Sequence, residues 1–113
     1  MKKIEALIRE EKLKTVINAL EGVGYPGITI TEVRGHGKQR GAKNDWHGQY
    51  VPPTLQTKLR LEVIVHDADV NPILNAIVDA ARTQEFGAGK IFVTDVLDAV
   101  RIRTNQRGEI ALD

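Results

Sequence analysis

Two stretches of this chain repeat one another in the same order, and the repeat constrains the fold more than any other feature. The matching pairs are Ile4–Ile8 with Leu61–Val65, Val16–Leu20 with Ile73–Ile77, and Thr31–Val33 with Thr94–Val96. The first two pairs share one offset, and the third follows an insertion in the second copy. Each copy has apolar residues first at alternating positions, then at helical spacing, then in a β-rich run, which indicates a strand–helix–strand unit.

The periodicity predicts an element order of strand, helix, strand, strand, helix, strand. The predicted segments are strand 3–9, a helix over 13–20 ended by Gly22 and Gly24, strand 28–33, strand 58–65, a helix over 70–81 capped by Asp67 or Asp69, strand 91–94 and a short fifth strand over 99–103. Pro72 falls in the first turn of the second helix, where a missing N–H costs little. Two such units in tandem form an α+β, ferredoxin-like βαββαβ sandwich. The alternative is that the copies match only because all βαβ units look alike.

Residues 37–57, between the two copies, show no periodicity and contain Pro52-Pro53. A loop of about 20 residues is uncommon in a compact domain and is usually functional or disordered. Trp46 and Tyr50 lie in this loop, although the chain has only five aromatic residues. Both interpretations stay open: the two aromatics form a partner surface, or they fold back and pack.

Composition excludes several classes of function. The chain of 113 residues suggests one domain, spanning 1–113. Cys and Ser are both absent, which excludes disulfides, thiolate metal sites, serine nucleophiles and serine phosphorylation. With 16 basic and 15 acidic residues, no broad nucleic-acid field is expected, and no aromatic platform for RNA lies on the predicted central strands. Since no apolar run could span a bilayer or serve as a signal peptide, we expect a cytoplasmic protein that is not inserted in a membrane.

Two Gly/Lys segments and one pair of arginines have the chemistry of anion sites. Gly35–Gly41 carries three glycines and two cations, and Gly87–Lys90 carries two glycines and a lysine. Glycines let backbone N–H groups approach an anion, and the cations add charge. Arg101 and Arg103 would share one face of the predicted fifth strand and suit a polyphosphate. The alternatives are flexible turns and a solvated edge strand.

The sequence gives little support for a metal site or for acid–base catalysis. His36, His47 and His66 lack the spacing of metal ligands, and no pair of carboxylates is placed as acid and base.

These motifs together resemble the PII nitrogen-regulatory signalling family. The resemblance covers almost the whole chain and is carried by Met1–Ala6, Thr29–Gly41, Ala80–Thr83, Gly89–Val93, Ala99–Thr104 and Arg107–Glu109. It implies a homotrimer that is not an enzyme, with ATP or ADP bound in clefts between subunits. It also implies a target-binding T-loop over about residues 37–57, a phosphate loop over about 82–90 and a C-terminal arginine loop over about 101–108.

The resemblance also implies roles for individual residues. The nucleotide-binding set is Leu7, Thr29, Gly35, His36, Gly37, Lys38, Glu62, Val63, Ile64, Phe86, Gly87, Ala88, Gly89, Lys90, Arg101 and Arg103. Gln39, Gly41 and Lys58 match the 2-oxoglutarate site, and Gln39 also matches the residue that completes the Mg²⁺ shell. Trp46, His47 and Tyr50 would contact the partner, with an ammonium transporter as the first expectation.

Three positions depart from the family pattern. The run Trp46–Pro53 is unlike the usual uridylylation signature, so modification of Tyr50 stays open. His47 stands where members insert an arginine into an ammonium channel, and Ala88 replaces an acidic residue. These departures suggest a divergent subgroup that acts on another transporter or a metabolic enzyme, with an adenylate sensor that ignores 2-oxoglutarate as the alternative function.

Two other classes share the predicted fold. An acylphosphatase-type hydrolase would need a phosphate-binding loop after Arg9, and no such loop follows it. A trimeric metal-tolerance protein would bind metal without nucleotide.

Overall fold

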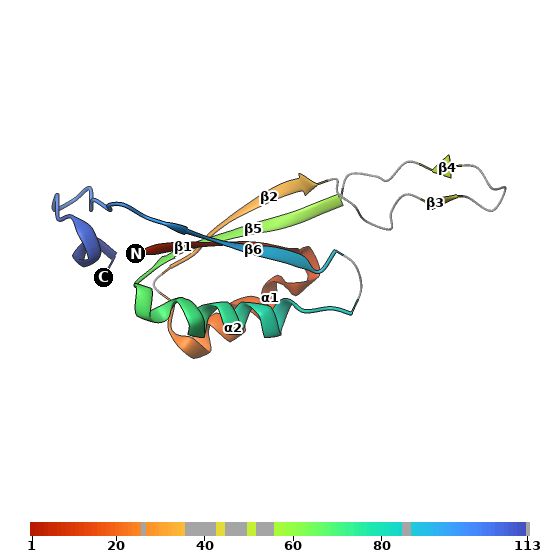
Figure 1. Ribbon diagram of the computed structural model, residues 1–113, viewed down its shortest axis with the longest axis horizontal. Coiled ribbons are helices and arrows are strands. Elements are labelled where there is room, and N and C mark those ends of the chain that lie inside the picture. Colours follow the sequence, from red (N-terminus) through yellow and green to blue (C-terminus); the bar gives the residue numbers. More distant parts are fainter. Residues whose placement is uncertain (26, 36–42, 45–49, 52–55, 85–86, 113) are drawn as a thin grey trace.

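Two helices cover one face of a four-stranded antiparallel sheet (Figure 1). The computed structural model describes residues 1–25, 27–35, 43–44, 50–51, 56–84 and 87–112. The strands are β1 (Lys2–Arg9), β2 (Thr29–Gly35), β3 (Lys43–Asn44), β4 (Tyr50–Val51), β5 (Gln56–Val65) and β6 (Gly89–Asp95). The helices are α1 (Leu13–Val23) and α2 (Val70–Ala81), and short 3-10 turns span Glu10–Lys12, Asp67–Asp69 and Gly108–Leu112.

The strand order is β2-β5-β1-β6, with every neighbouring pair antiparallel. The central pair, β1 and β5, is formed by equivalent strands of the two repeats, and the edge strands β2 and β6 are equivalent in the same way. The predicted ferredoxin-like βαββαβ fold is therefore confirmed. Within the segment predicted as a long loop, β3 and β4 form a separate two-residue ladder, Lys43 opposite Val51 and Asn44 opposite Tyr50.

The core uses the same positions in both repeats. Each residue buried in the first copy has a buried counterpart 57 positions later: Ile4 and Leu61, Ala6 and Val63, Ile8 and Val65, Val16 and Ile73, Leu20 and Ile77. In the sheet these side chains meet across the central ladder, since Ile4 pairs with Val63 and Ala6 with Leu61. The alternation predicted for β1 and β5 is confirmed, and the repeat marks one folding unit used twice.

The other face of the sheet is polar at its centre and is not covered by a helix (Figure 1). Glu5 and Glu62 lie directly opposite one another on β1 and β5, an unfavourable pairing of like charges. Each has its own cation: Lys3 Nζ lies 3.7 Å from a Glu5 carboxylate oxygen, and Arg60 Nε lies 3.1 Å from one of Glu62. This local compensation lets the two carboxylates share the face.

The predicted side-chain cap of α2 is wrong. Asp69 occupies the N-cap position, but its backbone is helical (φ −94°, ψ −4°) and its side chain makes no capping hydrogen bond. Side-chain capping needs an extended N-cap residue, and the 3-10 turn before α2 removes that geometry. Asp67 instead forms an ion pair with the N-terminal amine of Met1, 3.1 Å away. Gly24 ends α1 as predicted, in a left-handed conformation at φ 73°, but Gly22 does not, because the helix continues through it to Val23.

The predicted fifth strand over 99–103 is also wrong. Only one isolated antiparallel bridge forms, between Val100 and Arg107, and residues 102–104 are a turn. Asn105 closes this turn in the left-handed region, at φ 61°, and donates its N–H to Arg101 O at 2.7 Å. The alternating Val-Arg-Ile-Arg pattern therefore belongs to a tight hairpin, and the inference that Arg101 and Arg103 share one strand face fails.

In the described part of the chain, no helix has the length and apolar character needed to cross a lipid bilayer.

We predict that Gly89, the first residue of β6, cannot be replaced by a residue with a side chain. A Cβ built on it would lie 1.8 Å from Leu7 O, and its φ is 121°. We expect Gly89→Ala to destabilise the protein by about 2 kcal/mol or more, through both the clash and the backbone strain. Urea unfolding followed by circular dichroism measures the change.

Gly22→Ala is the matched control, because its Cβ would meet nothing within 4 Å and it lies in α1. This variant should keep or slightly raise the stability, by up to about 1 kcal/mol, because Ala favours helices. Equal effects of the two substitutions would contradict the close approach of β6 to β1.

Candidate functional site

Two cations from neighbouring strands converge on one backbone carbonyl. Arg9 at the end of β1 is paired in register with Lys58 of β5. Arg9 Nε donates to Gly87 O at 3.2 Å, and Lys58 Nζ donates to the same oxygen at 2.9 Å. Gly87 belongs to the connection between α2 and β6 and has φ 86°. The three residues join the sheet to the predicted phosphate loop.

Among the residues that the structure describes, no carboxylate forms an ion pair with Lys58. Burial, and secondarily repulsion from Arg9, lower the pKa of Lys58 below its ordinary value. A neutral carbonyl oxygen accepts from both side chains but cancels neither charge. Arg9 also has the carboxylate of Glu11 3.8 Å from its guanidinium. An anion placed beside Lys58 would make a stronger hydrogen bond than the neutral carbonyl does, because charge-assisted hydrogen bonds are stronger than bonds to a neutral acceptor.

A cavity of about 540 Å³ lies next to this cluster, between α2 and the first residues of β6. Its lining includes Val78 and Arg82 of α2 and Leu7, Gly89 and Lys90 of the sheet. Leu7 and Lys90 are directly opposite each other on β1 and β6. The structure thus brings together four of the predicted nucleotide-binding residues, Leu7, Ala88, Gly89 and Lys90, in the lining of one cavity.

A second group of predicted residues lies farther along the sheet. Thr29 pairs with Glu62 at the last step of the β2–β5 ladder, so from Val63 onward β5 is paired with β1 alone. The Val63 side chain is buried on the helix-covered face, which leaves its backbone as the part that a ligand can reach. This geometry fits recognition of a planar ligand edge by backbone groups.

The C-terminal segment, which carries Arg101 and Arg103, lies beyond the opposite end of the sheet from the loop that precedes β6 (Figure 1). Lys90 pairs with Leu7 and Asp95 with Lys2, so β6 alone separates the two groups by about 17 Å at the usual rise per residue. The Arg101 guanidinium donates to Gln106 Oε1 at 2.7 Å and to Ile110 O at 3.2 Å. Arg103 is exposed. Within one chain, these arginines do not reach the cavity.

Several predicted site residues lie outside the described residues: His36, Gly37, Lys38, Gln39, Gly41, Trp46, His47 and Phe86. Gly35 ends β2 and Tyr50 begins β4, and only their backbones are described. Among the described residues, no three His, Asp or Glu side chains gather as a metal site.

The sequence interpretation considered Arg9 only for the acylphosphatase-type alternative and gave it no place in the nucleotide or 2-oxoglutarate site. Alternation placed Arg9 on the uncovered face of β1, but sequence spacing gives no register between β1 and β5. Only that register sets Arg9 opposite Lys58, and only the fold of the loop adds Gly87.

Comparison with known proteins identifies the class. Residues 1–106 match the family described as "Nitrogen regulatory protein P-II". "Nitrogen regulatory protein P-II 2" of Methanothermobacter thermautotrophicus is 45% identical over 112 residues, covering 99% of this chain and 97% of that protein. "Nitrogen regulatory protein P-II" of Cereibacter sphaeroides is 42% identical over 112 residues, covering 99% of this chain and all of that protein.

A solved structure agrees with these relatives. The crystal structure of Arabidopsis thaliana PII bound to citrate has a TM-score of 0.79 and 35% sequence identity, covering 97% of this chain and 90% of that one. The chain thus shares its fold with a solved P-II protein, and P-II proteins are regulatory proteins that transduce signals and are not enzymes. The chain belongs to the P-II nitrogen regulatory protein family. This membership displaces the acylphosphatase-type and metal-tolerance alternatives.

The lowered pKa of Lys58 predicts how this residue titrates and how the stability of the protein depends on pH. Because the folded-state pKa lies below the ordinary lysine value, folded Lys58 should lose its proton at a lower pH than exposed lysines. Stability should rise with pH across that window, where the unfolded chain binds more protons. Arg9→Met should move the pKa of Lys58 upward but not fully back, because burial is the larger cause. Lysine ε-carbon chemical shifts followed through an alkaline titration measure it.

Asp95→Asn provides the control. Its hydrogen bond and charge raise the pKa of Lys2, so this change should lower the pKa of Lys2 and leave Lys58 unaffected. An unchanged Lys58 titration in Arg9→Met would mean that the two cations do not interact.

Proposed function

We propose that this protein is a P-II-type regulator that binds ATP or ADP, and a small carboxylate effector, in clefts formed by two subunits of a homotrimer. The observation that carries the proposal is the division of the predicted site into two groups at opposite ends of one chain. The phosphate loop with Lys90 lies at one end of β6, and Arg101 and Arg103 lie past the other. A second subunit that supplies the arginines would complete each site.

The phosphate side of the site follows from the loop before β6. Gly87 and Gly89 both have positive φ, at 86° and 121°, and have no side chain to keep an anion from the backbone, so their N–H groups are proposed to donate to the phosphates. Lys90, the next residue of β6, is proposed to add a cation to the phosphate side of the site. Lys38 and His36, outside the described residues, are proposed to close over the phosphates from the base of the T-loop.

The base side of the site is proposed to be Thr29, Glu62, Val63 and Ile64. The open edge of β5 after Glu62 offers backbone donors and acceptors to the adenine edge, which explains why the site needs no aromatic residue. Leu7 would supply an apolar contact. The Glu62 side chain lies in an ion pair with Arg60 on the uncovered face.

The carboxylate effector is proposed to bind Lys58 and Arg9. The Arabidopsis relative is described as bound to citrate, a polycarboxylate. Here the two cations on Gly87 O form a site of the matching charge. By resemblance the physiological effector is 2-oxoglutarate, with Gly41 contributing and with Mg²⁺ bridging it to ATP through Gln39. Phosphate and carboxylate oxygens are the ligands that Mg²⁺ prefers.

Assembly and partner binding complete the proposal. In the single chain several apolar side chains of β6 and the C-terminal segment are exposed, among them Phe92, Val93, Leu97, Ile102 and Ile110. Exposed apolar groups at this density favour burial against other subunits. The T-loop, with Trp46, His47 and Tyr50, would then bind or release a partner in the cytoplasm according to which ligands are bound. The partner would be an ammonium transporter, another transporter or a metabolic enzyme. Each ligand shifts the loop only by its differential affinity for the two loop conformations.

Calorimetry with ATP, ADP and adenosine tests the nucleotide site. Lys90→Ala should weaken ATP binding about ten- to hundred-fold, since a charged hydrogen bond contributes roughly 1.5–3 kcal/mol, and should leave adenosine binding unchanged. Lys14→Ala, on the exposed surface of α1, is the control and should change neither affinity. No binding of ATP or ADP at about millimolar concentration would overturn the proposed function.

A second titration tests the carboxylate site. With ATP and Mg²⁺ present, Lys58→Met and Arg9→Met should each weaken 2-oxoglutarate binding by about tenfold or more, because each removes one charged donor. Lys14→Met serves as the control for loss of a surface charge. Wild-type protein that binds ATP but never 2-oxoglutarate would instead support the alternative, a sensor of adenylate state alone.

A further inference from the structure

The C-terminal segment forms a hairpin that the hydrophobic core does not hold. Its arms are joined by backbone hydrogen bonds, Arg101 N to Gln106 O and Gly108 N to Ala99 O, each 2.9 Å long. No residue of the described stretch 97–112 is buried, and Leu97 and Ile102 are 97% and 99% exposed. The conformation of the hairpin therefore depends on polar contacts.

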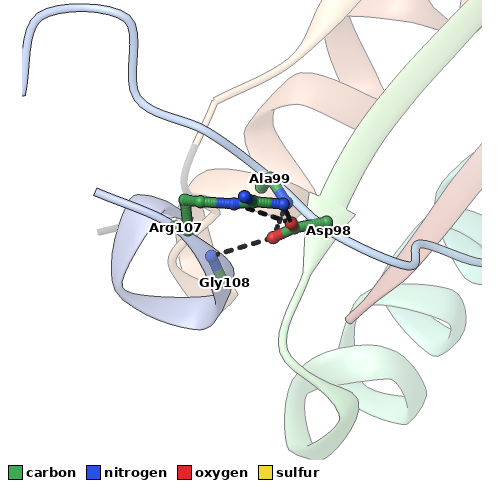
Figure 2. A network of polar contacts seen from close by, with 4 residues as sticks. All are labelled: Asp98, Ala99, Arg107 and Gly108. Atoms are coloured by element: carbon green, nitrogen blue, oxygen red, sulfur yellow. Dashed lines mark hydrogen bonds and ion pairs between the residues drawn. The ribbon is translucent and has the colours of Figure 1, made fainter. Parts of the chain in front are cut away.

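Asp98 joins both arms at the base of the hairpin (Figure 2). One carboxylate oxygen accepts the N–H of Ala99 at 2.9 Å and of Gly108 at 3.2 Å. The other accepts Arg107 Nε at 2.9 Å and also contacts Arg107 Nη2. An exposed ion pair by itself usually contributes little. Here two guanidinium nitrogens contact one carboxylate oxygen while the other oxygen accepts two backbone N–H groups, so one side chain connects both arms.

The ionisation of Asp98 keeps these contacts formed at neutral pH. The Arg107 guanidinium, and then the N–H of Ala99, hold the pKa of the Asp98 carboxyl below its usual range. The carboxylate is therefore charged, and the hairpin base closed, wherever ordinary aspartates are ionised.

Closure of the base determines where the two functional arginines lie. Arg101 and Arg103 both fall inside the loop that Asp98 and Arg107 close. The backbone of Arg101 is fixed twice, by its own N–H to Gln106 O and by the N–H of Asn105 to its carbonyl. An open base would leave both arginine side chains to be ordered when the ligand arrives.

We propose that Asp98, acting through Arg107, is a positioning residue that pre-orders Arg101 and Arg103 for the phosphates of a nucleotide held by a second copy of the chain. This inference rests on the proposed function and assigns a role to two residues that do not themselves contact the ligand. Asp98 neutralises Arg107 within the hairpin, so the positive charge left for an anion is concentrated on Arg101 and Arg103.

Calorimetry on the full-length protein with ATP and with adenosine tests the proposal. Asp98→Ala should weaken ATP binding about five- to fifty-fold, the range expected when two arginine side chains must be ordered on binding, and should change adenosine affinity by less than about twofold. Asp98→Asn should weaken ATP binding less, because its side-chain oxygen still accepts from Ala99 and Gly108. Loss of amide-exchange protection at Gly108 in Asp98→Ala would report the opened base directly.

A double-mutant cycle separates positioning from a general structural effect. In an Arg101→Ala/Arg103→Ala background, Asp98→Ala should have no further effect on ATP binding, because the arginines through which it acts are gone. Asp95→Ala is the matched control: Asp95 is three residues away and forms an exposed ion pair with Lys2, outside the hairpin. This control should bind ATP as the wild type does.

Three results would overturn the inference, and they are distinguishable. Wild-type ATP affinity in Asp98→Ala would remove the positioning role and leave the proposed function intact. If Asp98→Ala weakened the binding of ATP and of adenosine equally, Asp98 would have a general structural role and no specific role in positioning the arginines. Wild-type protein that binds no ATP would overturn the proposed function itself, and this inference with it.

Discussion

Burial of one face of β1 and β5 beneath α1 and α2 is the interaction on which the rest of the structure depends. The same positions of both repeats supply it, as in the pairs Ile4–Leu61 and Leu20–Ile77. These residues are almost fully buried, and each apolar side chain removed from water stabilises the fold by roughly 1.5–3 kcal/mol. Because the two units are equivalent, the sheet order is symmetric, with the repeats' first strands at the centre and their second strands at the edges.

This arrangement also determines where ligands can bind. With the helices on one face, the polar groups of the sheet gather on the other face and at its ends. Arg9, Lys58 and the Gly87 carbonyl meet at one end, and the C-terminal hairpin projects from the other. One short sandwich cannot fold its two ends together, so a site that uses both ends requires more than one chain. The family to which the chain belongs is consistent with that requirement.

Local physics explains which predictions were confirmed. Alternation in β1 and β5 and helical spacing in α1 and α2 predicted the buried residues correctly. Burial of one face of a strand or a helix directly imposes a period of 2 or 3.6 residues on the apolar positions. Two predictions were wrong because the local sequence pattern was compatible with more than one structure. Asp69 was predicted to cap α2 with its side chain, but a 3-10 turn supplies helical backbone there. Residues 99–103 alternate like a strand, yet the left-handed Asn105 and the Asp98–Arg107 pair make them part of a hairpin.

The sequence by itself determined the repeat, the α+β class, the buried faces, the Gly/Lys loop and the absence of thiol and serine chemistry, because these follow from residue type and local period. The tertiary structure alone decided the rest. Strand register placed Arg9 beside Lys58, and hydrogen bonds ten residues apart closed the hairpin around Arg101 and Arg103. Register depends on contacts between segments far apart in the chain, and hairpin closure depends on contacts across a turn. The alternating and helical patterns of residues specify neither kind of contact.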